Sequence, residues 1–293
     1  MPSPRPLPAS VTDAGFTVRE ALAAGATRGR LRAKDLATPF RGVRMRADAA
    51  DDLPTRCRAY ARSVNAEHVF SHATAARLWT LPLPARIENS DDLHVLYLDG
   101  QRAPRGAGIV GHKSSRSIAT VDREGLRITD PIATWILLAT MLTHDELVLA
   151  GDRLLRWRDP LADADALARA VAALSGERGA RRLRSAHADV RPGSASPRES
   201  RVRLAIVRAG LPEPELNAAI GTSLGVVHGD LVFPRQRVVL EYDSEHHRLD
   251  DRQWALDLHR YNALNAAGWR VIRISKAMSD TDIVAAVRRA LHG

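Results

Sequence analysis

The sequence predicts a multi-domain α/β protein, and three observations support this prediction. At 293 residues the chain is long enough to bury more than one hydrophobic core. Helical patterns alternate with short apolar strands along most of its length. Between two helical patterns, the stretch HADVRPGSASP at 187–197 contains two prolines and a glycine, as is typical of a linker. We therefore predict three domains, over residues 1–50, 51–190 and 196–293.

Positive charge is concentrated towards the N-terminus. The formal net charge is +9; residues 1–50 hold nine Arg or Lys and four acids, whereas residues 196–293 hold fourteen and twelve. Arginine binds phosphate through paired hydrogen bonds and releases counterions, so this balance favours a polyanionic partner. The alternative is a GC-rich genome that encodes arginine in place of lysine.

Within residues 1–50 the order of the elements predicts a winged helix-turn-helix. TVREALAAG, from Thr17 to Gly25, is expected to form a short helix, ATRGRLRAKDL at 26–36 a second helix, and PFRGVRMRA at 39–47 a small strand pair. In such a module the second helix enters the major groove and the hairpin contacts phosphate. A basic helix packed on a neighbouring domain is the alternative. The candidate nucleic-acid-binding residues are Arg28, Arg30, Arg32, Lys34 and Arg44.

The middle region, residues 51–190, is predicted to mix helices with strands. Strands are expected over 93–99 and 107–113, and a helix is expected to start with Asp130 at the N-cap and Pro131 at the first helical position. Further helices are expected over 53–64, 71–79, 145–156 and 163–186. His72, His94 and His112 lack the mutual spacing of metal ligands, so they are predicted to be core or surface histidines.

Residues 196–293 are predicted to begin with a capped helix followed by strands. Ser196, Pro197 and Glu199 suit the N-cap, N1 and N3 positions and together form a capping box. After a strand over 210–220 comes a hairpin whose turn is expected at 234–236. That turn places Asp230 opposite Leu240, one register step from Glu241.

The hairpin carries the candidate metal site. Strand alternation puts Glu241 and Asp243 on one face, and Leu240 and Tyr242 on the other. The surrounding segment is apolar, and acids inside a buried segment need a cationic partner. A divalent cation near Asp230 and Glu241 would meet this need and suit phosphodiester hydrolysis. Pairing of each acid with an arginine is the alternative.

Downstream, a polar stripe runs along the helix predicted over 250–268. Gln253, Asp257 and Arg260 share one face of this helix. Beside a metal centre the stripe would orient a scissile phosphate, whereas on its own it is a solvated Asp257–Arg260 pair.

The residues of this C-terminal segment resemble the motifs of a known protein family. The segment from Glu199 to about residue 290 resembles the PD-(D/E)xK nuclease superfamily, in the branch similar to very-short-patch-repair endonucleases. The matching elements are Glu199-Ser200, GDLVFP with Asp230, LEYDSEHH with Glu241, Asp243 and His247, the series Gln253, Asp257 and Arg260, and GWRVIRIS.

The resemblance implies a restriction-endonuclease-like α/β/α domain with a mixed sheet of about four strands. It implies Mg²⁺ or Mn²⁺ held by Asp230, Glu241 and Glu199, with His247 in the place of an active-site histidine. Glu199 as a helix cap alone remains the alternative. The implied catalytic residues are Asp230, Glu241, Asp243, His247, Glu199 and Gln253. The chain departs from the family pattern in two places, because Asp243 replaces the usual lysine and Ser244 the usual glycine.

The first two thirds of the chain are similar to AbiEi-type antitoxins of type IV toxin–antitoxin systems. The similarity is carried by the basic segment 16–46, SHATAARLW at 71–79 and GLRITDPIATW at 125–135. It implies promoter binding, with a cognate toxin or a second copy of the chain as a further partner.

These observations together predict a protein that binds double-stranded DNA and carries a metal-dependent endonuclease domain. The alternative is a non-enzymatic, antitoxin-like autorepressor with a degenerate nuclease domain, which the missing lysine favours. An RNA-processing enzyme is a third hypothesis, since a basic module alone does not separate DNA from RNA. The single Cys57 excludes an internal disulfide and a cysteine-based zinc site. With no apolar N-terminal leader and no apolar window of membrane-spanning length, the protein is expected in the cytoplasm without a membrane partner.

Overall fold

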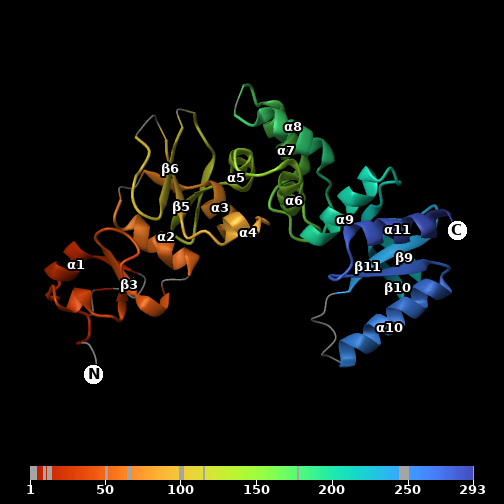
Figure 1. Ribbon diagram of the computed structural model, residues 1–293, viewed down its shortest axis with the longest axis horizontal. Helices are drawn as coiled ribbons and strands as arrows, with labels where there is room; N and C mark the ends of the chain where they lie inside the picture. Colours follow the sequence, from red (N-terminus) through yellow and green to blue (C-terminus); the bar gives the residue numbers. More distant parts are fainter. Residues whose placement is uncertain are drawn as a thin grey trace. The chain divides into compact units, whose positions relative to one another are not determined.

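The computed structural model confirms the mixed α/β class and divides into two compact units, residues 1–141 and 142–293 (Figure 1). It describes residues 5–8, 11, 15–49, 52–64, 67–98, 102–114, 116–176, 178–243 and 251–292, without the side chains of residues 49, 243, 251–255 and 257. The linker-like stretch 187–197 lies inside the second unit. No helix among the described residues is both long and apolar enough to cross a bilayer.

The first unit contains a small and a larger sheet. The three-stranded sheet has the order β1-β3-β2, and the five-stranded sheet has the order β6-β5-β4-β8-β7. The elements are β1 (Phe16–Thr17), α1 (Val18–Ala23), η1 (Arg30–Arg32), β2 (Leu36–Ala37), β3 (Val43–Arg46), η2 (Ala47–Ala49), α2 (Leu53–Ala61), β4 (His68–Phe70), α3 (His72–Leu78), α4 (Ala85–Glu88), β5 (Leu93–Tyr97), β6 (Ile109–Lys113), β7 (Thr120–Arg123), β8 (Leu126–Thr129) and α5 (Pro131–Leu138).

Local sequence signals set several of these boundaries. Thr17 caps α1 in a capping box with Glu20, and Gly25, with a φ of 91°, follows the end of the helix, as predicted. At the start of α5 the side chain of Asp130 accepts the backbone N–H of Ala133 at 2.6 Å, and proline stands at the first helical position. The helix start predicted from Asp130 and Pro131 is therefore confirmed, as is the end of the first helix at Gly25.

The prediction of a second helix over 26–36 is wrong. That segment forms only the 3₁₀ turn η1, which Ala33 ends in an extended conformation with a ψ of 148°. Gly29 lowers the helical propensity in the middle of the segment. The side chain of Arg30 is held by two hydrogen bonds to Asp35. Of the strand pair expected over 39–47, only β3 lies in that range. Its antiparallel partner β2 comes earlier, at Leu36–Ala37, and the two pair at Leu36 and Arg46.

A shared core holds the first unit together. Phe40, Val43 and Met45 from the N-terminal segment pack in one buried cluster with Phe70 of β4 and Val95 of β5. This shared cluster packs part of residues 15–49 against the larger sheet, while Phe16, Ala21 and Leu31 form a second, smaller buried cluster within the N-terminal segment.

The second unit begins with helices and ends with a sheet. Residues 163–186, predicted as one helix, form two helices interrupted around Gly176 and Gly179, both of which have positive φ. The elements are α6 (His144–Leu154), α7 (Ala164–Ala172), α8 (Ala180–Asp189), α9 (Pro197–Arg208), β9 (Glu215–Thr222), β10 (Gly225–Phe233), β11 (Val238–Asp243), α10 (Asp251–Ala266), β12 (Arg270–Ser275) and α11 (Asp280–His292).

The sheet of the second unit has the order β12-β11-β10-β9. β9, β10 and β11 are antiparallel neighbours, whereas β12 runs parallel to β11 after the crossover helix α10. Leu231, Leu240 and Ile283 belong to the core on the side of α9 and α11, and Val239 and Leu264 to the core on the side of α10. A four-stranded mixed sheet therefore lies between two helical layers (Figure 1).

A buried arginine joins the helices of the second unit. The side chain of Arg203 on α9 is 2% exposed and pairs with Asp152 on α6, whose side chain is 1% exposed, at 3.2 Å. Arg203 also donates to Glu213 at 2.9 Å and to the carbonyl of Asp189 at 2.7 Å. Burial raises the pKa of Asp152, and the arginine beside it opposes that rise. α6, α8 and α9 thus share one charged centre.

Candidate functional site

The register of the β10–β11 hairpin decides which acids meet. Leu231 pairs with Leu240, and the loop is the four residues 234–237, in which Arg237 has a φ of 53°. The prediction that Asp230 lies opposite Leu240 is therefore wrong by one residue, because the turn is one residue longer than expected. The strand pairing ends at Leu231 and Leu240. Beyond it the Asp230 side chain lies beside the backbone of β11, and Glu241 faces α10, where Arg260 contacts it.

Asp230 is partly buried beside the backbone of β11. Its Oδ2 accepts the backbone N–H of Tyr242 at 2.8 Å. Burial raises the pKa of the Asp230 carboxyl, while this hydrogen bond and the Arg260 guanidinium both lower it. The net upward shift indicates that the surrounding protein does not fully compensate a charge at this position.

Glu241 is paired with an arginine. Glu241 is 6% exposed, and its Oε1 accepts a hydrogen bond of 2.9 Å from Nη2 of Arg260 on α10. The same guanidinium donates to the carbonyl of His228. Of the two interpretations of the buried acids, ion pairing with arginine is therefore the one that the described residues show for Glu241.

Glu199 acts as a cap and also adjoins Asp230. Its carboxylate accepts hydrogen bonds from the Ala195 N–H at 2.8 Å, the Ser196 hydroxyl at 2.8 Å and the Asn217 amide at 3.0 Å. The predicted capping box is thus altered, because Glu199 reaches the N–H of Ala195 and not that of Ser196. Burial raises the pKa of Glu199, and the nearby charge of Asp230 raises it further.

The remaining predicted catalytic residues are only partly described. The backbones of Asp243 and Gln253 belong to β11 and α10, but their side chains lie outside the described part of the structure. His247 falls in the segment 244–250, which lies outside the described residues. The site that can be built therefore consists of Glu199, Asp230 and Glu241, with Arg260 as their cationic neighbour.

The basic residues of the N-terminal segment divide into two groups. Arg30 forms a bidentate pair with Asp35, at 3.0 and 2.7 Å, and also donates to the carbonyl of Arg5. Arg44 donates to the carbonyls of Leu31 and Val43, each at 2.8 Å. These two guanidinium groups hold the segment together. Arg28, Arg32 and Lys34 are exposed around η1.

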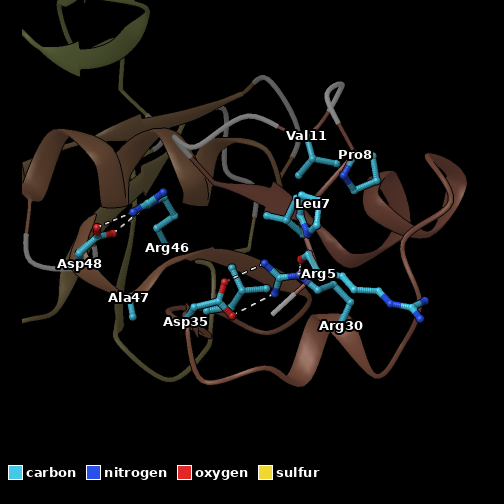
Figure 2. A pocket seen from close by; sticks show the side chains of 11 residues that line it. Arg5, Leu7, Pro8, Val11, Arg30, Asp35, Arg46, Ala47 and Asp48 are labelled. Atoms are coloured by element: carbon cyan, nitrogen blue, oxygen red, sulfur yellow. Dashed lines mark hydrogen bonds and ion pairs between the residues drawn. The ribbon is translucent and has the colours of Figure 1, made fainter. Parts of the chain in front are cut away.

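A hollow in this segment is framed by two ion pairs, as Figure 2 shows. Arg30 and Asp35 form one pair, and Arg46 and Asp48 form the other, at 2.8 Å. Since each of these arginines has an acid beside it, the hollow is less positive than the arginine count suggests. The exposed cations near η1 are better placed to meet a polyanion.

A histidine cluster in the first unit was not expected from the sequence. His72, His94 and His112 each offer one nitrogen within 4.8 Å of the other two, and the first two residues are buried. Burial lowers the pKa of His72 to about 2 and of His112 to about 4, and it also lowers the pKa of His94. Among the described side chains, this is the only group of three ligand-type residues gathered closely enough to share an ion.

The sequence contained only a weak signal for this cluster. His72 lies near the start of a predicted helix, and His94 and His112 lie within two predicted strands. Which strands are neighbours is a property of the sheet order and not of local spacing. Metal ligands supplied by three separate elements are therefore not visible as a sequence motif.

Comparison with known proteins assigns neither a family nor a function to this chain. No family model matches the chain, and neither the curated proteins nor the solved structures contain a match.

Proposed function

We propose that this chain binds double-stranded DNA and that its second unit hydrolyses phosphodiester bonds with Mg²⁺ or Mn²⁺. The observation that carries the proposal is the position of Asp230 beside β11 and close to Glu241. The Asp230 carboxylate accepts the N–H of Tyr242, and Arg260, which pairs with Glu241, also lowers the pKa of Asp230. The order α9-β9-β10-β11-α10-β12 supports the proposal, because it agrees with the restriction-endonuclease-like domain implied by the resemblance of this segment.

The chemistry of the donor set fits a hard divalent cation. Asp230, Glu241 and Glu199 offer carboxylate oxygens, which Mg²⁺ and Mn²⁺ prefer, but the three carboxylates are not gathered within 4.8 Å of one another in this structure, so binding one ion through all three requires them to move together. Burial raises the pKa of Asp230 and of Glu199, so both carboxylates gain from an additional positive charge. A cation held there supplies Lewis acidity to the phosphoryl oxygen and a more acidic water.

Arg260 has two roles in this proposal. Without nucleic acid, its guanidinium neutralises the charge of Glu241. Its side chain is 34% exposed, so it can turn towards a phosphate that approaches this face. In this proposal Arg260 stabilises the fold around the carboxylates when no DNA is present, and it orients the scissile phosphate when DNA binds.

The first unit supplies the docking surface. Arg28, Arg32 and Lys34 are exposed around η1 and suit contacts to the DNA backbone. Their position beside the β2–β3 hairpin supports a winged-helix type of docking, with a 3₁₀ turn in place of the second helix. AbiEi-like promoter binding is compatible with this surface.

One observation favours a second candidate function. The Arg260–Glu241 pair satisfies the buried acid without any metal, as expected of a nuclease-shaped domain that no longer cuts. The chain would then be a non-enzymatic DNA-binding regulator whose second unit contacts a toxin or a second copy.

A nicking assay on supercoiled plasmid separates the two functions. Wild-type protein with Mg²⁺ or Mn²⁺ is expected to nick the plasmid, and Asp230→Asn and Glu241→Gln are expected to abolish nicking while DNA binding in gel shifts is retained. Glu215→Gln, an exposed acid on β9, is the matched control and should nick as the wild type does. Gel shifts on duplex DNA and duplex RNA identify the nucleic acid. Intact DNA binding without cleavage at any metal concentration would establish the regulator instead.

A further inference from the structure

Three separate elements of the first unit bring their histidines to one point. His72 is the first residue of α3, directly after β4, while His94 lies on β5 and His112 on the edge strand β6. β5 and β6 pair in parallel, with His94 opposite Val110 and Leu96 opposite His112, so both histidines project from the same face. The N–H of Ser71 donates to the carbonyl of His94 at 3.0 Å, which fixes the start of α3 beside β5.

Each ring is already oriented by a hydrogen bond. The Ser71 hydroxyl lies 2.9 Å from Nδ1 of His72, and Nδ1 of His94 lies 3.0 Å from Nε2 of His112. The Ser71 contact is of the kind that orients the ring of a metal-ligating histidine, because it engages one ring nitrogen and leaves the other for the ion. The contact between His94 and His112 instead joins two nitrogens that would both ligate the ion. The contact to Ser71 leaves Nε2 of His72 as its ligand atom.

The spacing of the nitrogens suits a tetrahedral ion. Two nitrogens bound at 2.0–2.1 Å to a tetrahedral centre are about 3.3 Å apart. The His94 and His112 nitrogens, at 3.0 Å, are already close to that value. Ligation through both requires the ring that now donates this hydrogen bond to carry its proton on its other nitrogen, a tautomer change that releases no proton.

The backbone at His72 is strained. Its φ is 47°, in the left-handed region that residues with a β-carbon disfavour. Such strain concentrates at ligand clamps and active sites, where the surrounding structure holds it in place. Here Ser71 and the pairing to β5 hold it, and the effect is to turn the imidazole towards the other two rings.

We propose that His72, His94 and His112 form a binding site for one transition-metal ion of the Zn²⁺, Co²⁺ or Ni²⁺ class. Three imidazole ligands without a carboxylate select these metals over Mg²⁺ and Ca²⁺. The fourth coordination position faces the side of His112, the partly exposed member of the group, and is open to water or to an exogenous ligand.

Metal binding changes the arrangement of the rings. The rings of His72 and His112 are stacked, with centroids 3.6 Å apart and an interplanar angle of 14°. Lone pairs of imidazole nitrogens lie in the ring plane, so two parallel rings cannot both direct them at one ion. The His72 ring therefore turns about its Cβ–Cγ bond when the ion binds, and the stack opens.

The ion would fix the edge of the sheet. β6 is the outer strand, and in the described residues it contacts the sheet through β5 alone. An ion shared by β6, β5 and α3 cross-links that strand to the core of the first unit. The site is distinct from the carboxylate site of the second unit in both ligands and metal preference, and it does not depend on the proposed nuclease function.

The test is metal titration of the full-length chain, purified without a histidine tag and stripped with a chelator. To keep the carboxylate site out of the result, the titration is repeated in the Asp230→Asn variant. We expect calorimetry to show one Zn²⁺ bound per chain and Co²⁺ to give the visible absorption of a four-coordinate ion. His94→Gln and His112→Gln should lose at least the roughly 10–100-fold in affinity that outer-shell changes cost. His259→Gln, on the exposed surface of α10, is the matched control.

Two results would overturn the proposal. One is the absence of saturable Zn²⁺ binding to the wild type, and the other is unchanged affinity in folded His112→Gln. If the variants do not fold, ¹⁵N-detected histidine ring signals of the wild type decide the matter. Shifts on Zn²⁺ addition confined to His72, His94 and His112 support the site, whereas shifts elsewhere alone refute it.

Discussion

Replacing Arg260 by methionine tests the link between stability and metal binding in the second unit. In the wild type the Arg260 guanidinium neutralises Glu241, whose side chain is 8% exposed. Methionine keeps most of the apolar stem but removes the charge and the hydrogen bond. The buried carboxylate then loses the positive charge and the hydrogen bond of Arg260, which costs free energy because the site is largely closed to water.

The size of the effect follows from the exposure of the two partners. Breaking a fully buried pair costs about 3–5 kcal/mol, and a hydrogen bond to a charged group contributes about 1.5–3 kcal/mol. Arg260 retains 34% exposure, so water screens part of the interaction. We expect a loss of about 2–3 kcal/mol, which lowers the melting temperature of a unit of this size by about 4–12 °C.

Metal should restore much of that loss. A divalent cation and the guanidinium neutralise the same Glu241 carboxylate, so Mg²⁺ or Mn²⁺ should bind Arg260→Met more tightly than the wild type and stabilise it more. Urea unfolding is monitored through the hydrogen exchange of backbone amides in β10 and β11. Because both strands belong to the second unit, this measurement reports on the stability of that unit alone. Arg235→Met, an exposed arginine in the loop of the same hairpin, is the matched control.

Either of two outcomes would contradict this prediction for Arg260→Met. If Arg260→Met unfolds at the same urea concentration as the wild type without metal, the pair does not stabilise the fold. If Mg²⁺ and Mn²⁺ stabilise both proteins equally, the cation does not bind at Glu241.

Three further predictions follow from described contacts. Arg203→Met should lower the free energy of unfolding of the second unit by about 3–5 kcal/mol in urea titrations, because it leaves a buried carboxylate unpaired. Hydrogen bonds from Arg208 hold the pKa of Asp145 at about 2, below its ordinary 3.8. The Asp145 charge therefore stabilises the fold above about pH 4, and this contribution disappears as the pH falls towards 2; Asp145→Asn should remove that part of the acid dependence. Arg28→Gln and Arg32→Gln should each reduce the salt slope of DNA binding by about 0.9 for every phosphate that the variant no longer neutralises, and unchanged slopes in gel shifts would refute the docking surface.

Features that depend on neighbouring residues in the chain were predictable. Asp130 followed by Pro131 specified the start of α5, because the cap contact spans only three residues. The apolar residues around the hairpin acids were correctly predicted to be buried, since Leu231, Val239 and Leu240 are each 0% exposed. The α/β class followed from the same local patterns.

Features that depend on tertiary contacts were not predictable from the sequence. The segment 26–36 has the composition of a helix, but the pairing of Arg30 with Asp35 and with the Arg5 carbonyl holds it in a 3₁₀ turn. One additional loop residue shifted the hairpin register. The histidine cluster depends on which strands are neighbours, which local periodicity does not encode.

The position of Arg260 also bears on the departure at Asp243. The nuclease family proposed for this segment has lysine there, whereas in this chain Arg260 of α10 contacts the second acid. An arginine is charged at every physiological pH, so it can position a phosphate but cannot accept a proton from water. If the second unit cuts DNA, proton removal must therefore fall to another group, and Arg260→Lys should keep charge near Glu241 without supplying a base. The rate of plasmid nicking by Arg260→Lys should therefore be lower than that of the wild type, with the same pH dependence. A shifted pH dependence would assign the proton transfer to residue 260.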